Sequence, residues 1–566
     1  MHGSDIAFFH SVSIYPDGEH RVSFERLSLD SPRVEKALGR EFLLVPAEAL
    51  ESLAEKAFDE IQFKLRPGYI AQLAAMAVDT MASEQERYVI QSLLLNASIA
   101  TEGVFPLCQD TGTASVYGWK GECVLVDGPK DGFHDDADAM AAGALASWKK
   151  KHLRNSQLAP LANFGERNTG DNTPLASHLV SVRGDEYRFL FVAKGGGSAN
   201  KTALFQETKH LLSPEAFEEF ITSVIAGLGV SACPPYRIVV ILGGQSPDEA
   251  ALAAKLASTG ALDALPCSPS KQSGTYRDLG LENAVMAAAA RSGWGAQFGG
   301  RLLARDARVI RLPRHAASLP VVVAVSCSAH RQAYAYINRD GYFVERLADA
   351  DDIRAIADSA STAAVHSAPD ISEAAFSGFG EARRIDMGVP GTPEAKAAII
   401  SLRSGELVAL WGKAVLVRDA AHARLLSMID RGETLPDWTA YPAFYASPTE
   451  TPDGAAVGSI GPTTSKRMDS YLASFSERGI FPLTIGKGER GPACREACAR
   501  YGGAYVVALG GAAALAASRY VSSCEVIDWP ELGMEAIRLV EFKGLPVLVA
   551  VDARGEDYYA NLVHKD

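Results

Sequence analysis

The chain has 566 residues, of which 47% are hydrophobic and 22% are charged, as in ordinary globular proteins. Its 55 Lys and Arg residues against 68 Asp and Glu residues give a formal net charge of −13. This balance disfavours a nucleic-acid-binding protein, which would present a basic face, but it leaves room for an anionic substrate held by a local cationic cluster.

Membrane and disulfide classes are also disfavoured. No apolar run approaches the roughly 18–20 residues of a membrane helix. The N-terminus lacks the basic start of a signal peptide, and Asp5, Asp17 and Glu19 argue against a transit peptide. We therefore expect a cytoplasmic protein. Its eight cysteines are sparse and include no C-x-x-C pair, so any metal site must be assembled from distant segments.

The first 350 residues combine helical and strand-like apolar patterns. An N-terminal arm over residues 1–45 is expected to contain strands and loops. The further elements expected are helices over 46–65, 69–100, 135–153 and 213–228, strands over 178–182, 187–193, 237–242, 308–312 and 320–325, and a hairpin over 333–344.

Residues 351–382 are rich in Ala, Ser and Asp and contain few strand formers, which indicates a linker between two domains. We expect an N-terminal domain over 46–350 and a C-terminal α/β domain over 383–566. The second domain is expected to begin with strands over 406–410 and 414–418 and a helix from Asp419. Two strands around a Lys-Gly turn are expected within 539–551. The predicted fold class is mixed α/β (α+β).

Seven polar, glycine-rich segments lie far apart in the chain. An ordinary turn explains any one of them, but seven that are rich in Arg, Lys, His and Thr indicate a cationic pocket for a small polycarboxylate or phosphate. The segments are 108–112, 167–172, 194–201, 314–315, 418–422, 461–467 and 486–490.

Two of these segments approach nucleotide-binding motifs without fulfilling them. Asn200 stands where a phosphate loop needs its second glycine. The strand expected after the second motif ends in Gly510-Gly511 and not in an acidic residue. A nucleotide-binding enzyme is therefore a distant alternative.

A longer set of motifs runs in order through most of the chain. It includes Cys108-Gln-Asp-Thr-Gly112, Ala193-Lys-Gly-Gly-Gly-Ser-Ala-Asn-Lys201, Ala232-Cys-Pro-Pro-Tyr236, Arg311-Leu-Pro-Arg-His315, Val325-Ser-Cys-Ser-Ala329, Gly461-Pro-Thr-Thr464, Arg467-Met-Asp-Ser-Tyr471 and Gly486-Lys-Gly488. The set resembles the class I, iron–sulfur-dependent fumarate hydratase family. The resemblance implies reversible hydration of fumarate to (S)-malate in the tricarboxylic acid cycle, a homodimer, and an active site between two domains.

The resemblance further implies a [4Fe–4S] cluster held by Cys108, Cys233 and Cys327. Such clusters usually have four cysteine ligands, so three would leave one iron open to act as a Lewis acid. By the same carry-over, Thr463 is the base at C3 and Asp110 donates the proton to the leaving hydroxyl. The implied substrate-binding residues are Gln109, Arg154, Gly197, His315, Arg418, Arg467 and Lys487.

Some positions depart from the family pattern, among them Lys466, Glu489 and His330. Because Lys466 and Glu489 lie near the expected carboxylate clamp, the exact substrate stays open. The alternative is a related iron–sulfur hydro-lyase acting on mesaconate or tartrate. A noncatalytic iron-sensing or RNA-binding relative is disfavoured by the retained Asp110 and Thr463 and by the net charge of −13.

Overall fold

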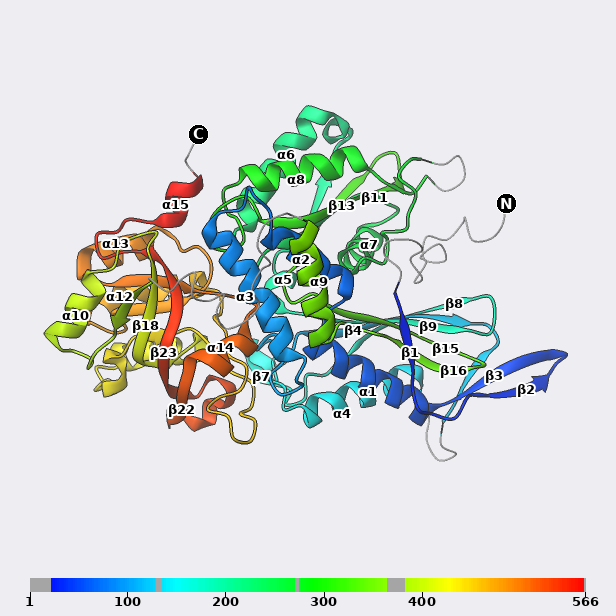
Figure 1. Cartoon of the computed structure of the whole chain (residues 1–566), viewed down its shortest axis with the longest axis horizontal. Helices are drawn as coiled ribbons and strands as arrows, with labels where there is room; N and C mark the ends of the chain where they lie inside the picture. Colours follow the sequence, from blue (N-terminus) through cyan, green and yellow to red (C-terminus); the bar gives the residue numbers. More distant parts are fainter. Residues whose placement is uncertain (1–21, 129–134, 270–273, 364–381, 564–566) are drawn as a thin grey trace.

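The computed structural model describes residues 22–128, 135–269, 274–363 and 382–563 (Figure 1). Residues 22–363 form an N-terminal part, coloured blue to green, and residues 382–563 form a C-terminal part at the opposite end, coloured yellow to red. The expectation of a mixed α/β fold is confirmed. Within the described ranges, no helix has both the length and the apolar character needed to span a membrane.

The N-terminal part is built on two main sheets. The six-stranded sheet has the order β1-β16-β15-β9-β4-β8, and the five-stranded sheet has the order β10-β14-β11-β13-β12. The strands are β1 (Phe24–Arg26), β4 (Thr113–Gly121), β8 (Ala176–Val182), β9 (Tyr187–Lys194), β10 (Ala203–Glu207), β11 (Tyr236–Gly244), β12 (Tyr276–Arg277), β13 (Ala304–Arg314), β14 (Leu319–Ser326), β15 (Arg331–Asn338) and β16 (Gly341–Glu345).

Smaller ribbons and the helices surround these sheets. The ribbons are β2 (Arg33–Ala37), β3 (Arg40–Pro46) and β5 (Val124–Asp127), and β6 (Leu158–Pro160) with β7 (Glu166–Asn168). The helices are α1 (Ala47–Phe63), α2 (Pro67–Ala77), α3 (Glu84–Ala100), α4 (Asp136–Lys150), α5 (Gly196–Ala199), α6 (Pro214–Leu228), α7 (Pro247–Thr259), α8 (Leu279–Arg291) and α9 (Ala350–Ala363).

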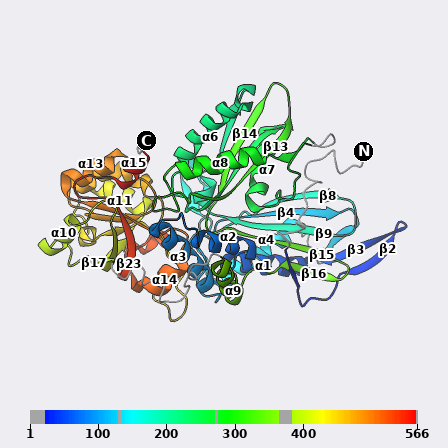
Figure 2. The same ribbon diagram turned by 45° about the horizontal axis from the view of Figure 1, so that its top comes forward.

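Helix α7 lies between the two main sheets (Figure 2). One core cluster joins its alanines to Trp119 and Leu190 of the six-stranded sheet and to Val239 and Ile241 of the five-stranded sheet. The central strand β11 is buried along its whole length, which explains its uninterrupted apolar run.

One expectation for this part was wrong. The helix expected over 69–100 is two helices, because a capping box starts α3: the Ser83 hydroxyl accepts from Glu86 N and the Glu86 carboxylate accepts from Ser83 N. The expected linker 351–382 begins with α9, which packs against α2. Residues 364–381 lie outside the described residues.

The C-terminal part contains a seven-stranded sheet in the order β17-β18-β19-β20-β21-β23-β22, in which an additional β18–β23 pairing closes a ring. Its strands are β17 (Arg383–Asp386), β18 (Leu407–Leu416), β19 (Ala443–Phe444), β20 (Leu483–Gly486), β21 (Ala504–Ala508), β22 (Val521–Asp528) and β23 (Ile537–Val551). Its helices are α10 (Pro393–Ile400), α11 (Asp419–Asp430), α12 (Leu472–Glu477), α13 (Pro492–Tyr501), α14 (Ala513–Tyr520) and α15 (Tyr558–Val563).

The strand pairs expected over 406–418 and 539–551 are also wrong. Each is one long strand, β18 or β23, and the two pair antiparallel along their length. Gly544, with φ at +77°, stands where the register shifts between Leu410 and Trp411 of β18. A glycine in this conformation permits a bulge inside a continuous strand as readily as it permits a turn.

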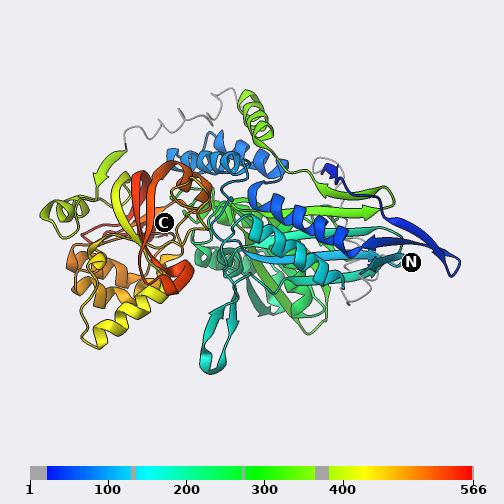
Figure 3. The ribbon, with the colours of Figure 1, turned by 90° about the horizontal axis from the view of Figure 1, so that it is seen from below.

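The two parts share a core. The cluster that contains α2, α3 and β11 residues also contains Tyr505, Leu515 and Leu548 of the C-terminal part. All three views show the yellow-to-red part set against one end of the blue-to-green part (Figure 3). The seam between them positions the cavity described below.

Helix packing under the six-stranded sheet gives a testable prediction. A Cβ at Gly143 of α4 would overlap the backbone of α1 at Glu51, so Gly143→Ala should destabilise the protein by about 1–3 kcal/mol. Gly68 in α2 has open space around its Cα, and Gly68→Ala should leave stability equal or slightly higher. Urea unfolding of both variants checks this; equal midpoints would refute the close α1–α4 contact.

Candidate active site

A cavity of about 650 Å³ lies between the two parts of the chain. Its polar lining comes from both parts and includes Cys108, Gln109, Asp110, Arg154, Lys201, Cys233, Cys327, Arg331, Arg418, Thr463, Lys466, Arg467, Lys487, Glu489 and Glu535. A pocket of this volume is large enough for a small organic substrate together with a larger group.

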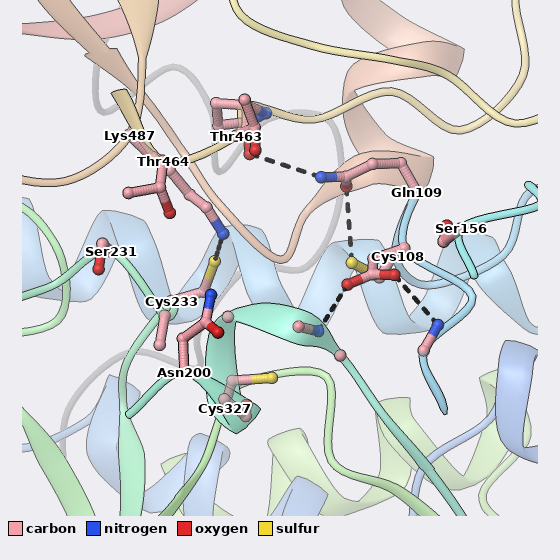
Figure 4. Close-up of a pocket in the computed structure, with 18 of the residues that line it drawn as sticks. Cys108, Gln109, Ser156, Asn200, Ser231, Cys233, Cys327, Thr463, Thr464 and Lys487 are labelled. Atoms are coloured by element: carbon pink, nitrogen blue, oxygen red, sulfur yellow. Dashed lines mark hydrogen bonds between the residues drawn. The ribbon is translucent and has the colours of Figure 1, made fainter. Parts of the chain in front are cut away.

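Three cysteines from distant segments face this cavity (Figure 4). Cys108 lies in the loop before β4, Cys233 in the turn before β11, and Cys327 directly after β14. Cys233 has φ at +62°, a conformation that non-glycine residues adopt at a cost. The backbone N–H of Ser328 donates to Cys233 O at 3.0 Å, which ties the second and third cysteine segments together.

Burial and one lysine influence the pKa values of the thiols. Burial raises the pKa of Cys233 to about 11 and also raises the pKa of Cys108. Lys487 opposes this for Cys233, because its Nζ lies 2.8 Å from Cys233 Sγ. The residue predicted to clamp a substrate carboxylate therefore contacts a predicted cluster ligand in the free chain.

The predicted proton donor Asp110 is held as a carboxylate. Burial alone would raise its pKa, but Arg154, Arg331 and backbone donors outweigh burial and lower it. Gly196 N donates to Oδ2 at 2.9 Å, and Gly112 N donates to Oδ1 at 3.1 Å. The glycine-rich segment after β9 thus donates a hydrogen bond to the Asp110 carboxylate, and its Gly197 also lines the cavity.

The predicted base Thr463 stands on the opposite wall. Its N–H donates to Tyr445 O at 2.7 Å, and its carbonyl accepts from Lys487 N at 3.2 Å. Arg467 donates from Nη2 to Thr463 Oγ1 at 3.2 Å and pairs with Asp419 at 3.1 Å. The Arg467 guanidinium therefore contacts the Thr463 hydroxyl, which must lose its proton if Thr463 is the base.

Two further arginines of the predicted set line the same space. Arg154 is held by Ser447 O at 2.9 Å, and its Nη2 lies 3.5 Å from Asp110 Oδ1. Arg418 lies 3.7 Å from a carboxylate oxygen of Glu535, which also lines the cavity. Gln109 donates to Pro462 O at 3.4 Å across the seam.

His315 is placed differently from the other predicted residues. It is exposed in the loop between β13 and β14 and does not line the cavity of its own chain. A role at the substrate would need a second copy of the chain to bring it there.

Sequence reasoning missed one buried cation. Arg331 is 2% exposed and donates from Nη1 to Gln62 Oε1 and Asp110 O, both at 2.7 Å. It follows Cys327 by four residues, but an arginine at the start of a strand carries no signal of its own. Lys466 and Glu489, the departures from the family pattern, both line the cavity.

His422, in the segment 418–422, has a structural position. It is 1% exposed, lies against the rings of Tyr445, Tyr471 and Phe475, and its Nδ1 bonds Arg418 O at 2.8 Å. Burial lowers its pKa to about 4. It therefore stays neutral and supports the backbone of Arg418.

Within the described part of the chain, no three His, Cys, Asp or Glu side chains are arranged around a single ion. This does not conflict with a cluster, in which each cysteine binds a different iron atom. The site-facing thiols, the cationic neighbours and the absence of a Cβ at Gly510, where one would overlap Cys233 Sγ, fit a bulky group with thiolate ligands.

Comparisons with known proteins bear on the whole chain. The family model for fumarate hydratase (Fumerase) matches residues 51–336, and the model for the fumarase C-terminus matches residues 355–562. The chain is 40% identical over 555 residues to the aerobic class I fumarate hydratase of Escherichia coli (strain K12), covering 98% of this chain and 97% of that protein. It is 39% identical over 560 residues to fumarate hydratase 2 of Leishmania major, covering 98% and 95%.

A shorter similarity involves a different enzyme. The chain is 33% identical over 176 residues to the L(+)-tartrate dehydratase subunit beta of Escherichia coli (strain K12), which covers 30% of this chain and 85% of that protein.

The burial of His422 predicts an acid-sensitive fold. Folding lowers the pKa of His422 from 6.5 to about 4, so the unfolded chain binds a proton more readily than the folded one. The free energy of unfolding therefore decreases as pH falls below about 6.5. Between pH 7 and pH 5 this amounts to about 2 kcal/mol. In His422→Phe that part of the loss should vanish from urea unfolding curves, whereas His315→Gln should keep it. An unchanged pH dependence in His422→Phe would contradict the assignment.

Proposed function

Since the chain belongs to the class I fumarate hydratase family and is a hydro-lyase of that family, we propose that its cavity catalyses the reversible hydration of fumarate to (S)-malate. The observation that carries the proposal is the convergence of three cysteines, Asp110 and Thr463 on one cavity from both parts of the chain. Cys108, Cys233, Cys327 and Thr463 are each more than ninety positions from the next in the sequence.

Cys108, Cys233 and Cys327 would hold a [4Fe–4S] cluster. Bound through three cysteines, such a cluster would supply an open iron as a Lewis acid for the substrate oxygen. The other cysteines do not face this cavity: Cys494 and Cys498 are buried on α13, and Cys267 is exposed.

The protonation states of the free chain suit the hydration direction. Asp110 is a carboxylate and takes the proton from water as the hydroxyl adds to C2. The double-bond electrons move to C3 and onto the neighbouring carboxylate, and Thr463 then gives its hydroxyl proton to C3. The resulting alkoxide is stabilised by Arg467, which already donates to this oxygen. Return of the Asp110 proton to Thr463 through solvent completes the cycle, and dehydration runs the same steps backwards.

Cationic side chains recognise the two carboxylates of the substrate. Arg154 lies beside Asp110 and Arg467 beside Thr463, and Arg418 and Lys487 also line the cavity. A dianion with carboxylates at its two ends would therefore meet a cation at either end, and fixed donors aimed at developing charge contribute much of the rate.

A hydro-lyase acting on mesaconate or tartrate is the second candidate. Lys466 and Glu489, which both line the cavity, favour it, and so does the similarity to a tartrate dehydratase subunit. Steady-state kinetics with fumarate, mesaconate and tartrate separate the two: a kcat/KM highest for fumarate supports the first proposal, and a higher value for either other acid replaces it.

Homodimer formation and a cytoplasmic location stay predictions. The exposed His315 does not line the cavity of its own chain, so a role at the substrate would require His315 of the partner subunit. Sedimentation of the purified chain tests this association.

The cluster assignment predicts a selective loss of colour. Cys108→Ser, Cys233→Ser and Cys327→Ser should each lose the brown chromophore and the turnover of malate, because each removes one of three ligands. Cys267→Ser removes an exposed cysteine away from the cavity and should keep both. Anaerobic purification followed by absorbance and iron analysis checks this. A full cluster in any of the first three variants would refute the ligand set.

The role of Thr463 predicts an effect on turnover more than on binding. Thr463→Ala should keep the chromophore and lower kcat by about a hundredfold or more, the usual contribution of a positioned acid or base. Thr463→Ser keeps the hydroxyl next to Arg467 and should recover much of the rate. An ultraviolet absorbance assay with fumarate measures both; near-normal kcat in Thr463→Ala would move the proton transfer to another residue.

A further inference from the structure

The loop over residues 107–112 carries two of the proposed functional groups, Cys108 and Asp110. It lies between α3 and β4 and belongs to no helix or strand, so its backbone polar groups need partners from other segments. At its start, Leu107 N donates to Gln62 O at 2.9 Å, which ties the loop to the last turn of α1. We call residues 107–112 the first cysteine loop.

One buried arginine holds the far end of this loop. Arg331 Nη1 donates to Asp110 O at 2.7 Å and to Thr111 O at 3.1 Å. The same nitrogen donates to Gln62 Oε1 at 2.7 Å, and Gln62 Nε2 donates in turn to Thr111 O at 3.2 Å. Arg331 is 2% exposed and Gln62 is 0% exposed. Removing either side chain would therefore leave loop carbonyls unpaired away from water, which is costly.

The place of Arg331 in the chain makes it a link between the cysteine segments. It is the first residue of β15 and follows Cys327 by four residues. Its bonds to the two loop carbonyls join this third cysteine segment to the first. Ser328 N, which donates to Cys233 O at 3.0 Å, joins the third segment to the second. One short segment thus sets the relative positions of all three cysteines.

The charge of Arg331 is not matched by its hydrogen bonds. All three acceptors of Nη1 are neutral oxygens, and Nε has no hydrogen-bond partner among the residues that the structure describes. A buried guanidinium without a counter-ion is costly. Arg331 lines the large cavity together with Cys108, Cys327 and Asp110, where negative charge would collect once thiolates hold a metal cluster.

Two glycines leave room for the guanidinium at this wall. A Cβ at Gly112 would lie 3.0 Å from Arg331 Nη2, and a Cβ at Gly195 would lie 3.7 Å from the same nitrogen. The Cβ at Gly195 would also lie 3.1 Å from Asp110 Oδ2. The positive charge is therefore close to the carboxylate of Asp110 as well as to its carbonyl oxygen.

We propose that Arg331 is a positioning residue of the active site. Its hydrogen bonds fix the first cysteine loop, and its charge stabilises the negative charge that collects at Cys108 and at the group held by the three cysteines. The part of the inference that concerns charge rests on the proposed function, because it needs the cluster. A direct contact between Arg331 and the substrate is the alternative, and it predicts a different kinetic result.

Reduction of the cluster measures the charge of Arg331. Arg331→Met removes a buried positive charge and should shift the midpoint potential of the cluster to a more negative value, because reduction adds an electron beside it. Arg331→Lys keeps the charge and should stay close to the wild type. Gln62→Leu is the matched control, since it removes only neutral hydrogen bonds to the same loop and should leave the potential unchanged. EPR-monitored redox titration of the anaerobically purified, cluster-loaded chain gives the values.

Amide hydrogen exchange measures the position of the loop. Arg331→Met and Gln62→Leu should both speed exchange in peptides that cover the first cysteine loop, because each removes bonds that close it. Arg331→Lys should also speed it, since one ammonium does not replace the planar fork. Peptides that cover α13 should exchange as in the wild type in every variant.

Kinetics separate a positioning residue from a substrate ligand. With Asp110 displaced, Arg331→Met should lower kcat for fumarate by about tenfold or more and leave KM within about twofold. Arg331→Lys should restore only part of kcat. Arg277→Met is the control for the loss of an arginine, because Arg277 pairs with Glu282 at 2.8 Å and does not line the cavity. It should keep the kcat of the wild type.

The outcomes distinguish this inference from the proposed function. A wild-type potential or wild-type loop exchange in Arg331→Met would overturn it, and so would a raised KM with unchanged kcat. Should Arg331→Met fail to fold, Arg331→Lys and Gln62→Leu decide: wild-type loop exchange in both would refute the positioning role. If the wild-type chain binds no cluster or does not hydrate fumarate, the proposed function fails. Loop exchange needs neither and still tests Arg331.

Discussion

The buried amide of Gln297 connects the pieces from which the active site is made. It donates to Pro234 O at 3.0 Å and to Gly510 O at 2.9 Å, and its oxygen accepts from Gly510 N at 2.8 Å. Pro234 directly follows Cys233, and Gly510 belongs to the C-terminal part. One side chain, 2% exposed, therefore fixes the second cysteine against the opposite wall of the cavity, and its bonds are expensive to break because their groups are buried away from water.

This contact forces a very close approach of the two parts. A Cβ on Gly510 would overlap Cys233 Sγ and crowd the Gln297 oxygen at 3.3 Å, so the seam closes only around glycine. The same closeness brings Lys487 within 2.8 Å of the thiol. As a result, Asp110 on one part and Thr463 on the other face a common space.

The sequence predicts local features of this arrangement better than long-range ones. Apolar runs predicted the strands β9 and β11, because a strand that is buried on both faces needs apolar residues throughout. The family motifs selected three cysteines, and all three line the same cavity. The turn expected near Gly544 is a bulge, since pairing with β18 across 130 residues outweighs the local preference for a turn. The role of Arg331 was not predictable, because its partners Gln62 and Asp110 come from distant segments that meet only in the fold.

The charges around the cavity suit the anionic substrate proposed above, although the chain as a whole has a net charge of −13. In the free chain, burial keeps the protons on Cys108 and Cys233, so Arg154, Arg418, Arg467 and Lys487 face too little negative charge. Thiolates bound to metal ions would supply part of the missing charge next to Lys487, and the two substrate carboxylates would supply the rest at the arginines. Under the proposed function, the cations are arranged for the loaded site and not for the empty one. Without ligands the cations repel one another, and the hydrogen bonds of Gln297 help to hold the two parts together against this repulsion.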